Sequence, residues 1–300
     1  MLPRYGPSAV TDGKWIYVYG GSPHSGRNGD DFMHQGLHAS IEKIDPTTLR
    51  SEYFSSGLYR RANHASVRIE NRFITCGGRS QVGLSRPKLR SCEYLDLSTG
   101  IFRELPPLPE AVRTLGLVEV EGDLYAIGGV MQPPLYSTST HRIRKNSTKW
   151  ERLADAPQGF SGQAIAIKDK IYVLGGYNHQ AMSSVMVFDS KTLQWKEMKD
   201  LPYPLSAYSA VTDGRFIYLF GDYVQMDSIH RYDPETGDLY LLDQKMTPRR
   251  HTAAVIVDSR AIVIGGNQTS AGKALTTIEA FELADLKFGG QKILQTQINK

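Results

Sequence analysis

Short apolar runs that end in a pair of glycines recur along the chain. One extends from Trp15 to Gly21, another from Leu124 to Gly129 and a third from Ile171 to Gly176. Each run is rich in β-branched and aromatic residues and has the length of one strand, and its glycines mark a sharp turn or a close approach of backbone. The second positions of six such doublets are 21, 78, 129, 176, 222 and 266, and Asp222 replaces the second glycine of the fifth.

The residues around the doublets keep the same order in every copy. Ten residues before the first glycine stands a valine or isoleucine, preceded by a residue that is small in most copies. Downstream, four of the copies carry a strand that leads into an aspartate and a turn, such as Tyr232-Asp233-Pro234, and an aromatic residue follows each doublet further on, such as Trp195. Each repeat therefore predicts four short strands, and a period close to 50 residues is typical of propeller arrays.

These six copies resemble the kelch repeat from about residue 2 to residue 288. The resemblance implies an all-β fold, a six-bladed β-propeller with four antiparallel strands per blade, forming a single domain over residues 1–300. The tail, residues 289–295, is expected to be the outer strand of the last blade. The first and last blades would then meet without sharing strands.

Composition narrows the functional classes. Hydrophobic residues make up 40% and charged residues 22% of the 300, which is typical of a globular protein, and no apolar run is long enough to span a bilayer. The net charge of +4 is too mild to predict a nucleic-acid partner. No secretory signal is visible, so we expect a cytoplasmic protein, most simply a monomer without a cofactor. Cys76 and Cys92 are interpreted as small buried thiols.

Function in such an array should lie where the copies differ. In each blade, the connection that enters the inner strand and the one that leaves the doublet should open on the same face, around the channel mouth. This face is predicted to be rich in arginine and aromatic residues and poor in acids. The candidate ligand-binding residues are Arg4, Tyr5, Arg61, Arg79, Arg113, Phe160, Tyr177, Tyr223, Arg250, His251 and Asn267.

Arginine forks pair well with carboxylates, and aromatic rings offer flat contact surface. The pattern therefore favours an acidic or hydroxyl-rich partner, either a protein segment or a carboxylate sugar. A simpler interpretation, in which these arginines pair with acids of neighbouring loops, stays open.

Two functions are compatible with this face. The kelch resemblance implies a non-catalytic binding module that holds a peptide or protein loop. The alternative is an enzyme similar to the kelch-type sialic-acid mutarotases, suggested by the rim arginines and by residues 265–275. Asp222 would then be its acid or base; a structural role for Asp222, paired with Arg250, is the competing interpretation.

One further cluster contains side chains that can bind a divalent metal. Asp30, His34 and His38 would share one face if residues 30–38 were helical. Gly26, Asn28 and Gly29 argue for a loop instead, and a fourth ligand is not apparent. No metal site is therefore predicted.

Overall fold

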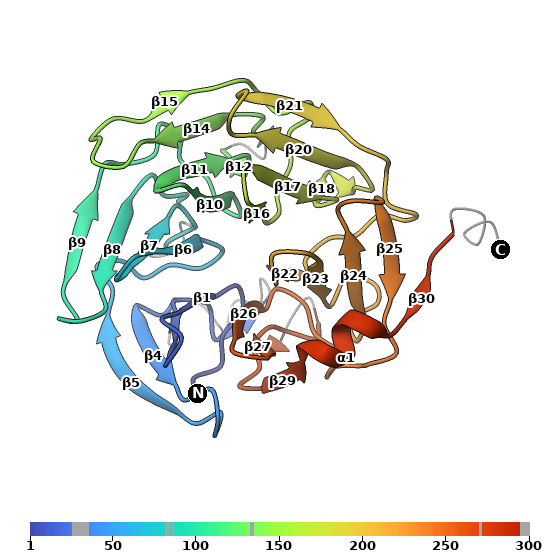
Figure 1. Cartoon of the computed structure of the whole chain (residues 1–300). Coiled ribbons are helices and arrows are strands. Elements are labelled where there is room, and N and C mark those ends of the chain that lie inside the picture. Colours follow the sequence, from blue (N-terminus) through green and yellow to red (C-terminus); the bar gives the residue numbers. More distant parts are fainter. Residues whose placement is uncertain (26–35, 82–84, 86, 133–134, 270–271, 295–300) are drawn as a thin grey trace.

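Six β-sheets surround a central axis in the computed structural model of the chain, which describes residues 1–25, 36–81, 85, 87–132, 135–269 and 272–294 (Figure 1). Each sheet places its first strand nearest the axis, and these six inner strands contact one another in a closed circle. They are β1 (Ser8–Thr11), β6 (Ala65–Ile69), β10 (Gly116–Val120), β16 (Ile165–Ile167), β22 (Ser209–Thr212) and β26 (Ala253–Val257). The predicted six-bladed propeller is confirmed.

Blades one to five continue outward through three more antiparallel strands. In blades one and two these are β2 (Ile16–Tyr19), β4 (Ser40–Ile44), β5 (Ser51–Ser56), β7 (Arg72–Cys76), β8 (Cys92–Asp96) and β9 (Phe102–Leu105). Blades three and four add β11 (Asp123–Ile127), β14 (Thr140–Ile143), β15 (Glu151–Arg152), β17 (Lys170–Leu174), β20 (Val185–Asp189) and β21 (Gln194–Glu197). Blade five adds β23 (Ile217–Phe220), β24 (Ile229–Asp233) and β25 (Asp238–Leu241).

Among the described residues, three short two-stranded sheets lie outside the main sheets of the blades. β12 (Val130–Met131) pairs with β13 (Leu135–Tyr136), and β18 (Tyr177–Asn178) pairs with β19 (Gln180–Ala181). β3 (His24–Ser25) of blade one pairs with β28 (Gly272–Lys273) of blade six. This last pair ties together the two blades that lie furthest apart in the sequence.

Blade six departs from the pattern. Its sheet holds three strands, β26, β27 (Arg260–Ile264) and β29 (Ile278–Glu282), and the helix α1 (Leu283–Phe288) follows. The expectation that the tail forms the outer strand of blade six is wrong, because β30 (Gln291–Lys292) pairs with β25 of blade five. The physical reason is that α1 carries the chain across, burying Leu283 and Leu286 between the two blades. In the described part of the chain, no helix is long and apolar enough to cross a membrane.

The hydrophobic core consists of layers between neighbouring blades. The second strand of a blade is covered on both faces by the neighbouring blades. β2 and β23 are therefore buried along their whole length, whereas the outer strand β21 is largely exposed. Aromatic residues of outer strands reach into these layers. Trp195 of blade four packs against blade three and donates its indole N–H to the Ala154 carbonyl at 3.1 Å. Each blade therefore depends on its neighbour for burial of its apolar faces.

In five of the six blades, the glycine doublet joins its blade to the next. The N–H of the second glycine donates to a carbonyl that precedes the next inner strand, as Gly21 does to Arg61 (2.8 Å) and Gly266 to Arg4 (2.7 Å), and the latter bond closes the ring. A Cβ at the first glycine, Gly20 or Gly221, would lie within 3.0 Å of the next blade's backbone. Both residues also have a left-handed φ, so glycine is required for two independent reasons.

Two alanine substitutions in blade five separate these reasons. Gly221→Ala should lose about 1–2 kcal/mol from its φ of 70° and a further ~1–3 kcal/mol from the clash with the Arg249 carbonyl. Gly214→Ala has a φ of 87° but nothing within 4 Å of its added Cβ, so it should lose only the first amount. Urea unfolding measures both. Equal losses would contradict the close approach of blade six.

The two cysteines form a disulfide bond, so their interpretation as separate buried thiols is wrong. Cys76 ends β7 and Cys92 begins β8, and the register of these strands places them directly opposite each other, with Cα atoms 4.1 Å apart. Both side chains are buried in the layer between blades two and three. The pairing of the two cysteines depends on the register of β7 and β8, which the amino-acid composition does not predict.

Candidate functional site

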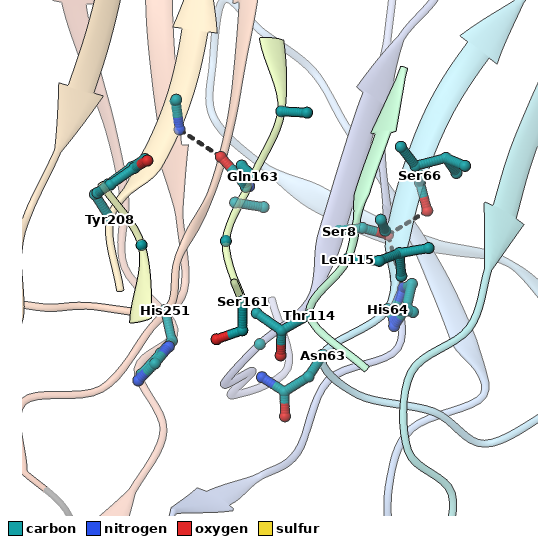
Figure 2. Close-up of a pocket in the computed structure, with 18 of the residues that line it drawn as sticks. Ser8, Asn63, His64, Ser66, Thr114, Leu115, Ser161, Gln163, Tyr208 and His251 are labelled. Atoms are coloured by element: carbon teal, nitrogen blue, oxygen red, sulfur yellow. Dashed lines mark hydrogen bonds between the residues drawn. The ribbon is translucent and has the colours of Figure 1, made fainter. Parts of the chain in front are cut away.

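A cavity of about 640 Å³ extends along the propeller axis. The inner strands line it with small side chains, among them Ala9, Ala164 and Ala254. Polar side chains gather where the connections enter these strands, and Figure 2 shows Asn63, Thr114, Ser161 and His251 grouped at that end. A cavity of this size, lined by small side chains inside and by polar side chains at its mouth, suits a narrow ligand or the tip of a chain segment.

The two connections of each blade meet at this mouth, as the repeat pattern predicted. The residue that enters an inner strand forms a β-bridge with the residue that follows the doublet of the same blade. Five blades show the bridge: Tyr5 with Ser22, Ala62 with Arg79, Arg113 with Val130, Ser161 with Tyr177 and Arg250 with Asn267. The variable corners of the blades therefore converge on one face.

A circle of backbone hydrogen bonds surrounds the mouth. One residue just before each inner strand belongs to it, and we call this set the mouth ring: Gly6, Asn63, Thr114, Gly162, Ala207 and His251. Each of five members bonds to the neighbouring blade: Gly6 N–H to His251 C=O (3.0 Å), Asn63 to Gly6 (2.8 Å), Thr114 to Asn63 (2.7 Å), Gly162 to Thr114 (3.1 Å) and His251 to Ala207 (2.8 Å). All members except Gly162 have a left-handed φ. These bonds link five of the six blade junctions at the mouth.

Five of the predicted residues line the cavity: Tyr5, Arg113, Tyr177, Tyr223 and His251. Within the described residues, the Arg113 guanidinium has no hydrogen bond or ion pair, and Glu119 is the one acid in the lining. Burial and the nearby Arg250 and Arg113 lower the pKa of His251 to about 3. At neutral pH its imidazole is therefore uncharged, and Arg113 supplies the positive charge of this wall.

Three other predicted residues lie beside the mouth without lining the cavity. Arg79 donates from Nε to Asn63 Oδ1 at 3.2 Å. Arg250 stacks on the ring of Tyr223 at 3.8 Å and donates to its carbonyl at 3.3 Å, while Asn267 is buried. Arg250 thus holds Tyr223, whose side chain is 51% exposed, in position.

The structure buries Arg4 and Arg61 instead of placing them at the mouth, which corrects the prediction for both. Each is 0% exposed and forms an ion pair within its own blade, Arg4 with Glu42 at 3.0 Å and Arg61 with Glu93 at 3.1 Å. Each also donates to the carbonyl of the first doublet glycine. Arg249 repeats the arrangement with Glu279 in blade six. The simpler interpretation, that these arginines pair with acids, holds here, but the acids lie on the third strand of the same blade and not in neighbouring loops.

Phe160 is also buried. In blade four the segment between the bridging residue and the glycine doublet is one residue shorter than in the other blades, so the fixed offset used in the prediction points to the wrong residue. There Ser161, not Phe160, makes the bridge that Tyr5 makes in blade one, and the Phe160 carbonyl accepts the bond from Gly129. Phe160 therefore occupies the position of Arg4 and Arg61. It packs in the layer between blades three and four with Met186, which lies where Glu42 and Glu93 lie in their blades.

Breaking one buried ion pair should destabilise the protein strongly. Arg61→Val leaves Glu93 buried without its cation and should cost about 3–5 kcal/mol. The double variant Arg61→Val/Glu93→His installs the pair that blade three carries, Val112 and His141, and should recover part of that loss. Urea unfolding gives the values. Arg152→Ala, from an exposed ion pair, is the control and should change stability by less than about 0.5 kcal/mol. A single variant as mild as this control would contradict the structural role.

The Asp222 carboxylate accepts hydrogen bonds from backbone N–H groups. The expected pairing with Arg250 is wrong, because the described residues show no ion pair between the two side chains. The backbone donors are Ser206 (3.2 Å), Tyr223 (2.5 Å) and Gln225 (3.4 Å). In the other blades a backbone carbonyl accepts the bond that Ser206 donates here. Asp222 therefore replaces a missing bridge in blade five. It is 3% exposed and does not line the cavity, so it is poorly placed to act on a ligand.

This role predicts how substitutions of Asp222 behave. Asp222→Ala leaves the buried Ser206 N–H without an acceptor and should cost about 1–3 kcal/mol. Asp222→Asn keeps one carbonyl oxygen and should cost clearly less. Thermal unfolding monitored by circular dichroism compares the two, with Asp200→Ala on an exposed loop as control. Equal losses for alanine and asparagine would contradict the acceptor role.

A serine and a histidine in the channel wall look like a nucleophile and its base. Ser8 Oγ lies 2.7 Å from His64 Nε2 and 2.6 Å from Ser66 Oγ (Figure 2). Burial lowers the pKa of His64 well below its usual value. The contact joins blade one to blade two, and Ser209 with Thr252 makes the same inter-blade contact at 2.6 Å. These hydrogen bonds therefore hold inner strands together.

Two of the three potential metal ligands named from the sequence, Asp30 and His34, lie outside the described residues. His38 is described, and its Nε2 lies 3.0 Å from the Pro3 carbonyl. Among the described residues, no group of three or more potential ligands is close enough to hold a metal ion.

Sequence reasoning missed several polar residues of the cavity. Asn63, Thr114, Ser161, Gln163 and Tyr208 all line it. One available signal was position, because Asn63, Thr114 and Ser161 directly follow the bridging residues or take part in a bridge. Another was the repeated co-occurrence of arginine with a glutamate on the third strand, which marks Arg4, Arg61 and Arg249 as structural.

Comparison with known proteins agrees with this architecture. The model of the KLHDC2/KLHL20/DRC7 Kelch-repeats domain matches residues 114–295, more than half of the chain, and the Kelch motif matches residues 60–109. The chain belongs to the kelch-repeat family. Similar proteins include Kelch-like protein 35 of Mus musculus, 29% identical over 60% of this chain and 31% of that protein. Kelch-like protein 25 of Xenopus tropicalis is 26% identical over 77% of this chain and 39% of that protein.

A third relative, Beta-scruin of Limulus polyphemus, is 25% identical over 55% of this chain and 19% of that protein. The chain thus spans well under half the length of these relatives. None of the matches named here is a sugar mutarotase.

Proposed function

We propose that this kelch propeller is a binding module that holds a protein segment, acidic or rich in hydroxyl groups, at the mouth of its central channel. The observation that carries the proposal is Arg113, a cation on the cavity wall with no hydrogen bond or ion pair among the described residues. An unpaired guanidinium at a concave site is suited to a carboxylate, which it can bind through two parallel hydrogen bonds.

Neighbouring groups strengthen the positive charge of this corner. Lys88 lies close enough to Arg113 for their positive charges to repel each other. Burial and the charge of Arg113 lower the pKa of Lys88. Arg79 forms a β-bridge with Lys88 on one side and contacts Asn63 of the mouth ring on the other. Two positive charges, Lys88 and Arg113, thus face each other between blades two and three, while Glu119 is the one acid in the described cavity lining. An acidic segment would relieve this repulsion.

Aromatic residues of blades four and five continue the mouth next to Arg113 of blade three. Tyr177 and Tyr223 are 40% and 51% exposed, although both are large and partly apolar. Tyr177 lies 6.0 Å from Tyr136, which also lines the cavity. Exposed aromatic residues beside an unpaired arginine are typical of protein-binding surfaces. A catalytic function has no comparable support, because the carboxylate of Asp222 is committed to backbone.

An array of short peptides with blocked ends tests the proposal. We expect peptides rich in Asp, Glu and Ser to bind, and Arg113→Ala to weaken the strongest of them by about tenfold or more, measured by fluorescence anisotropy. Binding should weaken as salt increases. Arg152→Ala, which removes an exposed arginine from outer strand β15, is the matched control and should bind normally.

Two results would overturn the proposal. One is an array in which no acidic or hydroxyl-rich peptide binds better than its lysine-substituted counterpart. The other is a peptide that binds Arg113→Ala as tightly as the unaltered protein.

A further inference from the structure

The mouth ring is broken at one place, between blades four and five. Five of its six members donate an N–H to the neighbouring blade, but Ala207 has no such bond to Gly162. Within the described residues, neither the Ala207 N–H nor the Gly162 carbonyl takes part in a hydrogen bond. Both residues line the cavity. The break therefore leaves one backbone donor and one backbone acceptor at the channel mouth.

The break has a local cause in blade four. Gly162 is the one ring member without a left-handed φ, and the count of residues before its inner strand is shifted by one relative to the other blades. Ala207 keeps the ring conformation, with a φ of 64°, and its carbonyl still accepts the N–H of His251. Blade five thus presents the same edge as other blades, and blade four does not meet it.

A side chain spans the break deeper in the channel. Gln163, which precedes β16 of blade four, accepts the N–H of Ala210 in β22 of blade five with its Oε1 at 2.6 Å, and Figure 2 draws this bond as a dashed line. This link holds the two inner strands together below the mouth. The Gln163 side-chain amide N–H groups and the Ser161 hydroxyl, which both line the cavity, make no hydrogen bond among the described residues. The gap between Gly162 and Ala207 is therefore lined by polar groups, and the Gln163–Ala210 bond connects its two sides further inside the channel.

We infer that this break binds a main-chain amide of an extended peptide, whose carbonyl accepts the Ala207 N–H and whose N–H donates to the Gly162 carbonyl. A peptide group carries one donor and one acceptor, which is the complement that a missing backbone link requires. The inference rests on the proposed function for its ligand and adds to it. Arg113 would select the charge of the segment, whereas the break would bind its backbone without regard to sequence.

The geometry also orders the bound segment. Arg113 belongs to blade three, and the break lies between blades four and five, with Ser161 and Tyr177 between them on the cavity wall. A segment held at both points would cross the mouth over blade four and contact the exposed ring of Tyr177. Backbone recognition at one point and side-chain recognition at another is a common division in peptide binding.

Selective labelling with ¹⁵N-alanine tests the inference on the full chain. The Ala207 amide is assigned from its loss in Ala207→Gly, a change that keeps the left-handed conformation. On adding the strongest peptide of the array, we expect the Ala207 amide proton to shift downfield and to exchange more slowly with solvent. Ala62 is the internal control, because its N–H already bonds to Arg79 and should not respond.

A scan of the peptide by single N-methylation tests the second bond. One position should lose about tenfold in affinity, because methylation removes the N–H that donates to the Gly162 carbonyl. An Ala207 amide that does not respond, together with a scan without a sensitive position, would overturn the inference while Arg113-dependent binding survives. This result would indicate that water satisfies the two groups.

A second probe keeps the inference testable if the array yields no binder. N-methylacetamide, a single peptide group, should then shift the Ala207 amide and leave Ala62 unchanged. No shift with this probe would overturn the inference independently of the proposed function. A shift without any bound acidic peptide would retain the backbone site and reject the charge-based proposal.

Discussion

The whole propeller depends on backbone bonds that pass from one blade to the next. The second doublet glycine donates to the carbonyl of Arg61, Val112, Phe160, Leu205 or Arg4 on the following blade, and the last of these closes the circle. Such close contact between backbones leaves no room for a Cβ on the first glycine. Because every blade buries its faces only against its neighbours, a missing link would open one hydrophobic layer and expose the two sheet faces that form it.

Ion pairs of buried arginines stabilise the inside of three of the six blades. Arg4, Arg61 and Arg249 lie beneath the mouth, each with a glutamate from the third strand of its own blade. They satisfy glycine carbonyls at the point where two blades meet. Blades three, four and five replace these pairs by Val112 with His141, Phe160 with Met186 and Leu205 with His230. The break in the mouth ring lies between blades four and five, where the charged pairs are absent.

The two candidate recognition features have different physical origins. Arg113 is a charge that the described fold does not neutralise, so it favours an anionic partner. The break at Gly162 and Ala207 is an unfilled pair of backbone groups, so it favours a peptide group of any sequence. Together they would combine selectivity with affinity on one face of the propeller.

The sequence by itself determined the repeat, and with it the fold. Six doublets in one register require six equivalent strand ends, since only glycine tolerates both the left-handed φ and the approach of the next blade. The sequence also placed Tyr5, Arg113, Tyr177, Tyr223 and His251 at the channel, because their offsets from the doublet are preserved. Only the tertiary structure decided the rest. It showed which arginines are neutralised inside a blade, that Phe160 is shifted by one residue, and that the tail joins blade five. Each of these depends on partners brought together by register and packing between segments distant in the chain, which local spacing does not encode.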